Sequence, residues 1–326
     1  MIKITFLGTS GAVPTPKRNH PAILLNYNSD NILVDCGEGT QIQFKKAKIS
    51  AAKTTKLLIT HWHGDHVLGI PGLLQTLSFS GYNRTLEIYG PRGILENINN
   101  VLKAFPSVLV TDLRNRVKLK VFEAKGRFID EKDFYLEAFP VKHGIPCNAY
   151  CFVEKDKLRI DKKRLSKFKI PSGKFLSKLK QGEDIIYNGK KYSAKTLTYG
   201  KKGKKICIVM DTLYDKSIAS FVKNADLLIM ESTFTHDSEN LAERGKHMTA
   251  KKAAEIAKQA KVKKLILTHL SDRYDKNPEK VLKEARKIFK NSLPRGIRFF
   301  WSNCSTGPYS LHHRRSFGFF HHLCYF

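Results

Sequence analysis

The chain has 326 residues, with 58 Lys and Arg against 29 Asp and Glu, a formal net charge of +29. This length can bury a full core, as one large α/β domain or as a domain with an insertion. No segment approaches 18 uninterrupted apolar residues, so we expect no membrane-spanning helix. The basic excess suits a polyanion such as nucleic acid, although genome composition or adaptation to heat also produces Lys-rich surfaces.

The amino terminus reads as a strand. Residues 1–7 run directly into a Gly-rich turn, with no apolar signal region and no small-residue cleavage site. No Gly-Lys-Ser/Thr follows these glycines, so we interpret Thr9-Ser10-Gly11 as a turn above the functional site rather than as a phosphate loop.

The six cysteines form no CxxC pair and no even framework; they stand at positions 36, 147, 151, 207, 304 and 324. Cys36 and Cys207 lie inside apolar runs, where we expect them to pack rather than to bond. This usage favours a reduced, cytoplasmic compartment.

Four potential metal ligands follow the apolar run 56–60, in His61-Trp62-His63-Gly64-Asp65-His66. One tetrahedral ion cannot take all four together with later ligands, but two adjacent ions can divide them. Paired ions hydrolyse phosphate esters or amides. A lone His is more often a packed or surface residue. Here several polar groups would compete for partners in one loop unless a cation organised them.

Four later runs end in the same way, at His143, Asp211, Glu231 and His269. Short apolar runs are typical of strands covered on both faces. Because ligands of α/β folds gather at one edge of the sheet, we expect these ends to converge there.

A basic insertion is expected at about residues 154–190. Between positions 154 and 205 stand 18 Lys or Arg and only 5 Asp or Glu, an uneven excess that favours an RNA-binding arm over an idle solvated loop. We predict a short helix over residues 158–169. Phe175 and Tyr187 are candidates either for stacking on bases or for local packing.

The ordered motifs resemble a known family. His-x-His-x-Asp-His marks the metallo-β-lactamase superfamily. Together with His143-Gly144, Glu231-Ser232-Thr233 and His247-Met248-Thr249, it looks like ribonuclease Z, an endonuclease that trims 3′ trailers from precursor tRNA. The resemblance covers residues 1 to about 310. It implies an α/β fold of the αβ/βα type, a four-layer sandwich with an inserted basic arm. It also implies that two chains form a homodimer.

The resemblance also implies two Zn²⁺ per chain. His61, His63 and His143 would hold one ion, Asp65, His66 and His269 the other, and Asp211 would bridge them. Neutral imidazoles suit zinc, and a carboxylate between two cations helps to hold them together. In the family Asp65 also accepts the proton of the attacking water; its alternative role is that of a metal ligand alone.

His247 is the candidate proton donor to the leaving ribose oxygen, oriented by Glu231. Alternatively, Thr249 caps a helix over residues 250–261 and His247 only fills the preceding loop. Spacing leaves both interpretations open, and the resemblance favours catalysis. The expected RNA contacts are Lys162, Lys163, Arg164, Lys167, Lys174, Lys178 and Arg273.

Two features depart from the family. Pro171-Ser172-Gly173-Lys174 stands where the arm commonly has a Gly-Pro-rich tip, so the arm's grip on tRNA is inferred from position and charge. Residues 311–326 are rich in His, Phe and Arg. We expect a disordered tail without assigned function; a foreign or altered reading frame and an adventitious metal binder are the alternatives.

Two other functions stay open. One is a small-molecule ester or thioester hydrolase of the same superfamily, which has no need of a basic arm. The other is a non-catalytic RNA-binding protein with structural zinc, although such sites are usually closed and thiolate-rich.

Overall fold

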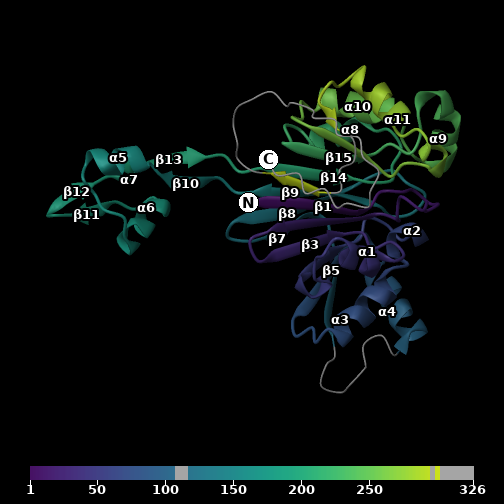
Figure 1. Cartoon of the computed structure of the whole chain (residues 1–326), viewed down its shortest axis with the longest axis horizontal. Helices are drawn as coiled ribbons and strands as arrows, with labels where there is room; N and C mark the ends of the chain where they lie inside the picture. The colour runs from purple at the N-terminus through teal and green to yellow at the C-terminus, as the bar shows by residue number, and fades with distance from the viewer. Residues whose placement is uncertain (107–116, 294–297, 302–326) are drawn as a thin grey trace, which may run out of the picture.

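Two seven-stranded mixed sheets face each other in the computed structural model, which describes residues 1–106, 117–293 and the backbone of 298–301 (Figure 1). The first sheet has the order β18-β1-β2-β3-β4-β5-β6, with bounds β1 Ile2–Gly8, β2 Ala22–Tyr27, β3 Asp30–Val34, β4 Lys56–Leu58, β5 Thr85–Gly90, β6 Lys118–Glu123 and β18 Arg298–Trp301. The second has the order β17-β16-β15-β14-β9-β8-β7, with bounds β7 Gly126–Asp130, β8 Phe134–Pro140, β9 Asn148–Glu154, β14 Lys205–Val209, β15 Leu227–Glu231, β16 Leu265–Thr268 and β17 Ser292–Leu293.

Helices cover the outer face of each sheet. Those beside the first sheet are α1 Thr40–Lys46, α2 Gly64–Val67, α3 Ile70–Phe79 and α4 Ile94–Ala104. Those beside the second are α8 Lys216–Phe221, α9 Glu239–Gly245, α10 Ala250–Gln259 and α11 Glu279–Arg286. Three separate hydrophobic clusters fill the space between the sheets and the two spaces under the helices. The predicted four-layer αβ/βα sandwich is therefore confirmed.

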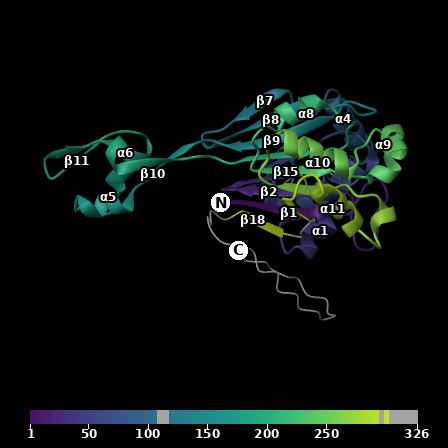
Figure 2. The same ribbon diagram turned by 90° about the horizontal axis from the view of Figure 1, so that it is seen from above.

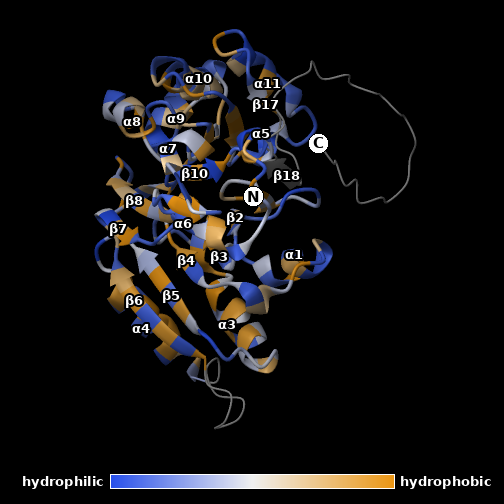
Figure 3. Cartoon of the chain, turned by 90° about the vertical axis from the view of Figure 1, so that its left-hand side faces the viewer, coloured by the Kyte–Doolittle hydropathy of each residue, from blue (hydrophilic) through white to orange (hydrophobic). Residues whose placement is uncertain are grey.

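Burial on both faces explains why several strands are apolar throughout. In β14 and β15, neighbouring parallel strands, Cys207 and Leu228 point to the helix side while Ile208 and Ile229 point to the other sheet. Figure 3 shows hydrophobic residues along the strands of the sandwich. A strand that is buried on both faces carries apolar residues on both of them. Its sequence is therefore a continuous apolar run, as seen here, rather than an alternation of apolar and polar residues.

The predicted helix over residues 250–261 is confirmed as α10. Its N-cap is Thr249, whose side chain accepts a hydrogen bond from the backbone N–H of Lys252. Ala253, Ala254 and Ala257 are buried against the second sheet. The cap and the small residues let α10 lie close to the strands that carry the candidate site.

The basic insertion is a small folded unit on a two-stranded stalk. Strands β10 (Lys157–Ile160) and β13 (Thr198–Lys201) pair antiparallel, and beyond them lie α5 Lys162–Lys167, α6 Ser177–Lys180, β11 Ile185–Tyr187, β12 Lys190–Tyr192 and α7 Ala194–Leu197. Figures 1 and 2 show this arm projecting from the sandwich. It has its own hydrophobic cluster, which includes Leu165, Leu179 and Leu197. The arm's elements thus run from Lys157 to Lys201.

The predicted helix over residues 158–169 is wrong in its first part. Leu158 and Ile160 belong to strand β10, and α5 begins only at Lys162. The side chain of Asp161 accepts hydrogen bonds from the backbone N–H groups of Lys163 and Arg164, which fixes the start of the helix there. The apolar spacing of this segment fits a strand followed by a helix as well as a single helix.

One cysteine prediction is also wrong. Cys207 forms a disulfide with Cys151. The two residues are register partners on the antiparallel strands β9 and β14, with Cα atoms 4.1 Å apart. Cys36 is buried and free, as predicted, and so is Cys147. The pairing depends on lateral strand register, which the spacing of cysteines along the chain does not reveal.

The predictions about the carboxyl-terminal tail and about membrane-spanning helices meet the limits of the described residues differently. The tail over residues 311–326 lies outside the described residues, as do the cysteines at positions 304 and 324. Within the described part of the chain, none of the helices is long and apolar enough to cross a membrane.

Candidate metal centre

The candidate ligands converge on one edge of the sandwich from loops of both sheets. His61, His63, Asp65 and His66 follow β4 of the first sheet, while Asp211 and His269 follow β14 and β16 of the second. His143 stands in the loop between β8 and β9. All seven predicted ligands form two groups that share or adjoin Asp211. The two halves of the fold therefore each supply part of the centre.

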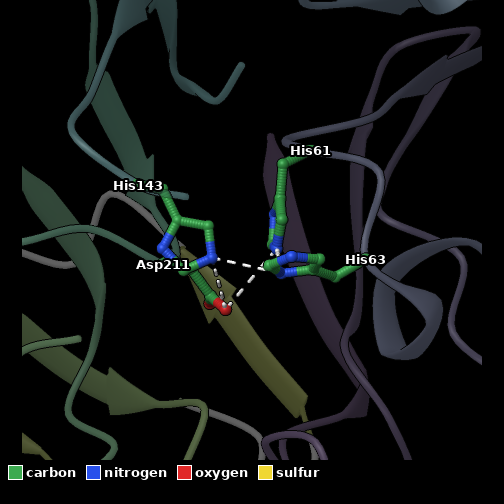
Figure 4. Close-up of side chains that lie close together, drawn as sticks. All are labelled: His61, His63, His143 and Asp211. Carbon is green, nitrogen blue, oxygen red and sulfur yellow. Dashed lines mark hydrogen bonds and ion pairs between the residues drawn. The ribbon is translucent and has the colours of Figure 1, made fainter. Parts of the chain in front are cut away.

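The first group consists of three imidazole nitrogens and one carboxylate oxygen (Figure 4). Nδ1 of His63 lies 3.0 Å from Nε2 of His61 and 3.1 Å from Nε2 of His143. Oδ2 of Asp211 lies 3.6 Å from Nε2 of His61 and 4.0 Å from Nε2 of His143. A tetrahedral zinc site with bonds of about 2.1 Å separates its ligand nitrogens by about 3.4 Å. The group therefore has the size of a metal site.

The second group is built in the same way. Oδ2 of Asp65 lies 3.4 Å from Nε2 of His66 and 3.3 Å from Nε2 of His269, and the two nitrogens are 3.3 Å apart. Asp211 reaches this group as well, because its Oδ1 lies 3.1 Å from Nε2 of His269 and its Oδ2 3.6 Å from Nε2 of His66. Asp211 thus stands between the groups and faces both.

The charges of the site fit a bound cation. Asp211 is 2 % exposed, and its Oδ1 has no hydrogen-bond donor among the residues that the structure describes. Burial alone would raise its pKa, but His269, His66 and His61 hold the pKa of Asp211 well below its usual range. Burial and the neighbouring His66 lower the pKa of His61 to about 2, so that its imidazole is neutral. A buried carboxylate together with imidazole nitrogens is a donor set that zinc accepts.

Outer hydrogen bonds orient the rings. Nδ1 of His66 lies 2.7 Å from Oδ2 of Asp35, a fully buried residue that also accepts from the backbone N–H of Thr60 at 2.8 Å. Nδ1 of His61 contacts the Thr60 hydroxyl at 3.1 Å, and Nδ1 of His143 lies 3.0 Å from the Lys246 carbonyl oxygen. These bonds leave the opposite nitrogens facing the groups.

Asp35 is a functional residue that the sequence motifs did not reveal. A signal was available, because this residue also follows an apolar run, the strand β3. Its backbone adopts φ 59°, a left-handed conformation that is uncommon outside glycine. The strain is consistent with a position that the surrounding loops hold in place for orienting His66.

His247 and Glu231 lie beside both groups. Nδ1 of His247 is 3.3 Å from Oε2 of Glu231 and 3.7 Å from Oδ2 of Asp211, without the alignment of a hydrogen bond. Glu231 is fully buried and accepts a hydrogen bond from the backbone N–H of Thr212 at 2.6 Å. Burial alone would lower the pKa of His247, but Glu231 and Asp211 raise it to about 9. The imidazole is partly open to solvent, with 17 % of its side chain exposed.

The other predicted contact residues divide between the site and the arm. Arg273, in the turn Asp272–Tyr274, lies with its guanidinium 5.1 Å from the centre of the Phe234 ring, and that ring is 6.2 Å from the His247 ring. The six others are exposed residues of the arm: Lys162, Lys163, Arg164, Lys167, Lys174 and Lys178. Arg164 is partly engaged, since it pairs with Asp161 at 3.3 Å.

The two arm aromatics stack on each other. The rings of Phe175 and Tyr187 are nearly parallel, with centroids 6.0 Å apart, and both pack against the hydrophobic cluster of the arm. This arrangement favours the packing alternative over stacking on bases.

Relatives of known family are similar in sequence to this chain over nearly its whole length. A ribonuclease Z of Methanothermobacter thermautotrophicus is 40% identical over 291 residues, which cover 89% of this chain and 92% of the relative. A ribonuclease Z of Prochlorococcus marinus is also 40% identical and covers 89% of this chain and 96% of the relative. The chain belongs to the ribonuclease Z family.

Solved structures agree with this family. The short form of human tRNase Z has 29% sequence identity and a TM-score of 0.61, and the match covers 83% of this chain and 93% of the human one. The metallo-β-lactamase fold protein YhfI of Bacillus subtilis, at 21% identity and a TM-score of 0.64, shares the fold, with 90% of this chain and 95% of YhfI covered. A family model described as Anti-Pycsar protein Apyc1 matches residues 2–160, slightly less than half of this ribonuclease Z family chain.

Metal binding should stabilise the folded chain, because the donors converge only in the native state. With free Zn²⁺ a thousandfold above its Kd, linkage contributes roughly 4 kcal/mol. For a chain of this size that corresponds to a rise in Tm of roughly 5–10 °C between the metal-free and the zinc-saturated protein. Calorimetry with and without a chelator measures this rise.

The matched variants are Asp211→Asn and His236→Ala. The first changes the carboxylate between the two groups and should abolish most of the zinc-dependent rise. The second changes an exposed histidine outside the site, paired with Glu239 at 2.7 Å, and should leave the rise intact. Equal zinc dependence in all three proteins would contradict a metal centre at Asp211.

Proposed function

We propose that this ribonuclease Z family member is a zinc-dependent endoribonuclease that removes 3′ trailers from precursor tRNA and leaves a 3′-hydroxyl on the tRNA. The observation that carries the proposal is the joint presence of two adjoining His/Asp groups at the sandwich edge and a strongly basic arm. The 40% identity to ribonucleases Z over most of the chain supports the same activity.

The proposed centre holds two Zn²⁺ per chain. His61, His63 and His143 would bind one ion and Asp65, His66 and His269 the other, with Asp211 between them. When bound, such a pair supplies a water of lowered pKa and neutralises charge on the phosphate that is attacked. The protein's share is to keep five imidazole and two carboxylate ligands in place and to leave one side of the centre open.

Asp65 is the proposed proton acceptor for the attacking water. Its side chain is 11% exposed, more than the 3% of Asp211, so it stands on the open side of the centre. Oδ2 faces His66 and His269. A carboxylate has two oxygens, so the roles of ligand and acceptor are compatible.

His247 is the proposed proton donor to the leaving ribose oxygen, since an alkoxide leaves poorly at neutral pH. Its ring centroid lies 5.5 Å from that of His143 and 5.4 Å from that of His269, which supports access to the reacting phosphate beside both groups. The Glu231 carboxylate, 3.3 Å from Nδ1, would orient the ring and favour its protonated form. Thr249 caps α10 in addition, and this cap is compatible with the proposed role of His247.

The arm would bind the tRNA by its charge. Lys162, Lys163, Lys167, Lys174 and Lys178 are exposed and have no acidic partner among the described residues. Unpaired lysines attract phosphates and release their counterions, which gives affinity without base specificity. Arg273 would contact a phosphate close to the metals, because its guanidinium rests on the Phe234 ring and retains its donors.

We propose further that the chain forms a cytoplasmic homodimer. Exposed apolar side chains on neighbouring elements support an interface at α1–α3: Ile42 is 53% exposed, Leu68 59% and Phe79 69%. Light scattering of the purified protein tests this part of the proposal, and a mass of one chain would contradict it.

One experiment separates the proposed activity from its two alternatives. The purified protein is incubated with a precursor tRNA carrying a 3′ trailer and with a generic small phosphodiester, each with and without chelator. We expect chelator-sensitive release of the trailer and a tRNA ending in a 3′-hydroxyl. Cleavage of the small ester alone would indicate a small-molecule hydrolase, and tight RNA binding without cleavage a structural zinc protein.

Removing the arm should uncouple RNA binding from chemistry. Lys157 and Lys201 are register partners at the base of the stalk, so a Gly-Ser linker can replace residues 158–200. Because the arm has a separate hydrophobic core, its removal should leave the unfolding temperature of the sandwich unchanged. We expect the Kd for precursor tRNA to rise at least roughly tenfold, with a shallower salt dependence, while turnover of a small phosphodiester is retained.

A charge variant of the intact arm provides the control. Lys162, Lys163 and Lys167 are changed to Glu together, and three exposed lysines of the sandwich, Lys223, Lys258 and Lys261, are changed in a matched protein. The arm variant should lose far more tRNA affinity. Equal losses in both proteins, or an equal loss on the small substrate, would contradict a separate docking arm.

His247→Ala should lower the turnover number on precursor tRNA by roughly 10²–10⁴, because the leaving oxygen loses its proton donor. The variant should still bind two zinc ions, as measured by elemental analysis. His236→Ala is the control histidine and should keep full turnover. Unchanged turnover in His247→Ala, or loss of its zinc, would rule out this role.

A further inference from the structure

The ring of His269 is oriented by a hydroxyl rather than directly by a carboxylate. Nδ1 of His66 meets Asp35 directly, whereas Nδ1 of His269 lies 2.9 Å from Oγ1 of Thr233. The same hydroxyl lies 2.6 Å from Oε2 of Glu231. Thr233 is 5% exposed, His269 1% and Glu231 fully buried, so water has little access to compete for these bonds. A buried chain of two hydrogen bonds thus joins His269 to Glu231.

The direction of the chain follows from counting protons. A carboxylate oxygen only accepts, so the single proton of the Thr233 hydroxyl points to Glu231. The hydroxyl oxygen is then left to accept, and Nδ1 of His269 must donate to it. With its proton on Nδ1, the ring presents the lone pair of Nε2, the nitrogen that lies 3.1 Å from Asp211 and 3.3 Å from Asp65. The tautomer required of a metal ligand is thereby selected.

Thr233 also contacts the backbone close to His269. His269 has φ 56°, a left-handed conformation that costs free energy in a residue other than glycine. The backbone N–H of Ser271, two residues further on, donates to the carbonyl oxygen of Thr233 at 3.2 Å. Thr233 therefore contacts both the ring and the loop that follows it. Together these two contacts restrict the orientation of the His269 ring.

Resting on the proposed zinc centre, we propose that Thr233 is the positioning residue that presents Nε2 of His269 to a metal ion. Through its hydroxyl it also ties the ring to Glu231, the carboxylate beside the proposed proton donor His247. The Thr233 hydroxyl touches neither metal nor substrate; it acts through His269. Its loss should weaken one metal site more than the other, because His269 lies with Asp65 and His66 and not in the group of His61, His63 and His143.

The test compares Thr233→Val, Thr233→Ser and Thr268→Val with the unchanged full-length protein. Valine keeps the shape of threonine and removes the hydroxyl, and serine keeps the hydroxyl. Thr268 is the matched control: it is fully buried next to His269, and its own hydroxyl has no hydrogen-bond partner in the described part of the chain. Zn²⁺ affinities are measured without substrate, by competition with a chromophoric chelator, and turnover on precursor tRNA is measured separately.

In Thr233→Val we expect one of the two zinc sites to weaken by roughly 10–100-fold. Thr233→Ser should restore most of that affinity, and Thr268→Val should bind both ions as the unchanged protein does. A general loss of packing would affect both valine variants alike. The selective loss in one of them, with rescue by serine, is what a positioning role requires.

The proposal is overturned if folded Thr233→Val binds both ions as tightly as the unchanged protein, or if Thr268→Val shows the same loss. Should Thr233→Val not fold, Thr233→Ala gives the same readout with a smaller side chain, and unchanged zinc affinities would again overturn the proposal. Failure of the unchanged protein to cut precursor tRNA would instead count against the proposed function, because the zinc affinities are read without RNA.

Discussion

The convergence of negative charge at one edge of the sandwich is the constraint on which the rest of the structure depends. Asp35, Asp211 and Glu231 are each at most 2% exposed, and Asp65 stands beside them. Carboxylates are costly to bury without compensating charge. The buried imidazoles compensate unevenly, because burial lowers the pKa of His61 to about 2 whereas Asp211 and Asp35 raise the pKa of His66. In the proposed centre, divalent cations between these groups would supply further positive charge, and the surrounding loops bring the ligand atoms together there.

The fold can meet this constraint because both sheets contribute ligands to the same edge. Strand β4 of one sheet and strands β14 and β16 of the other end at the same edge, and each end carries ligands. The sheets are joined by a common hydrophobic cluster, so their relative position is set by dense packing rather than by the ligands. Loop positions such as the left-handed Asp35 and His269 then carry local strain that the packed sheets can sustain.

The sequence predicted those features that are local along the chain. Apolar runs indicate strands, a polar residue at the end of a run indicates the sheet edge, and the cluster around His61 is contiguous. All seven candidate ligands were found in this way or through the family resemblance, and the structure brings them together. The four-layer order was implied by the resemblance.

Features that depend on lateral neighbours were missed. Cys151 and Cys207 meet because β9 and β14 pair in one register, and Thr233 meets His269 because β15 and β16 lie side by side. The segment 158–169 was misread because its apolar spacing suits a strand and a helix alike. A single sequence carries no direct record of register, so such contacts appear only when the strands are placed in space.

The separation of the arm from the metal centre has a consequence for how a cleavage position is chosen. Lysine contacts to phosphates are indifferent to sequence, so an arm of this kind holds an RNA without selecting a bond. The proposed two-metal centre, in turn, would act on one phosphodiester much as on the next. In the proposed function, selection must therefore come from the fixed offset between the two. The paired strands β10 and β13, rather than a flexible linker, set that offset. A structured RNA that spans the distance from the arm to the centre would then place one phosphate at the metals. The cleavage position would be selected by the shape of the RNA rather than by contacts to its bases.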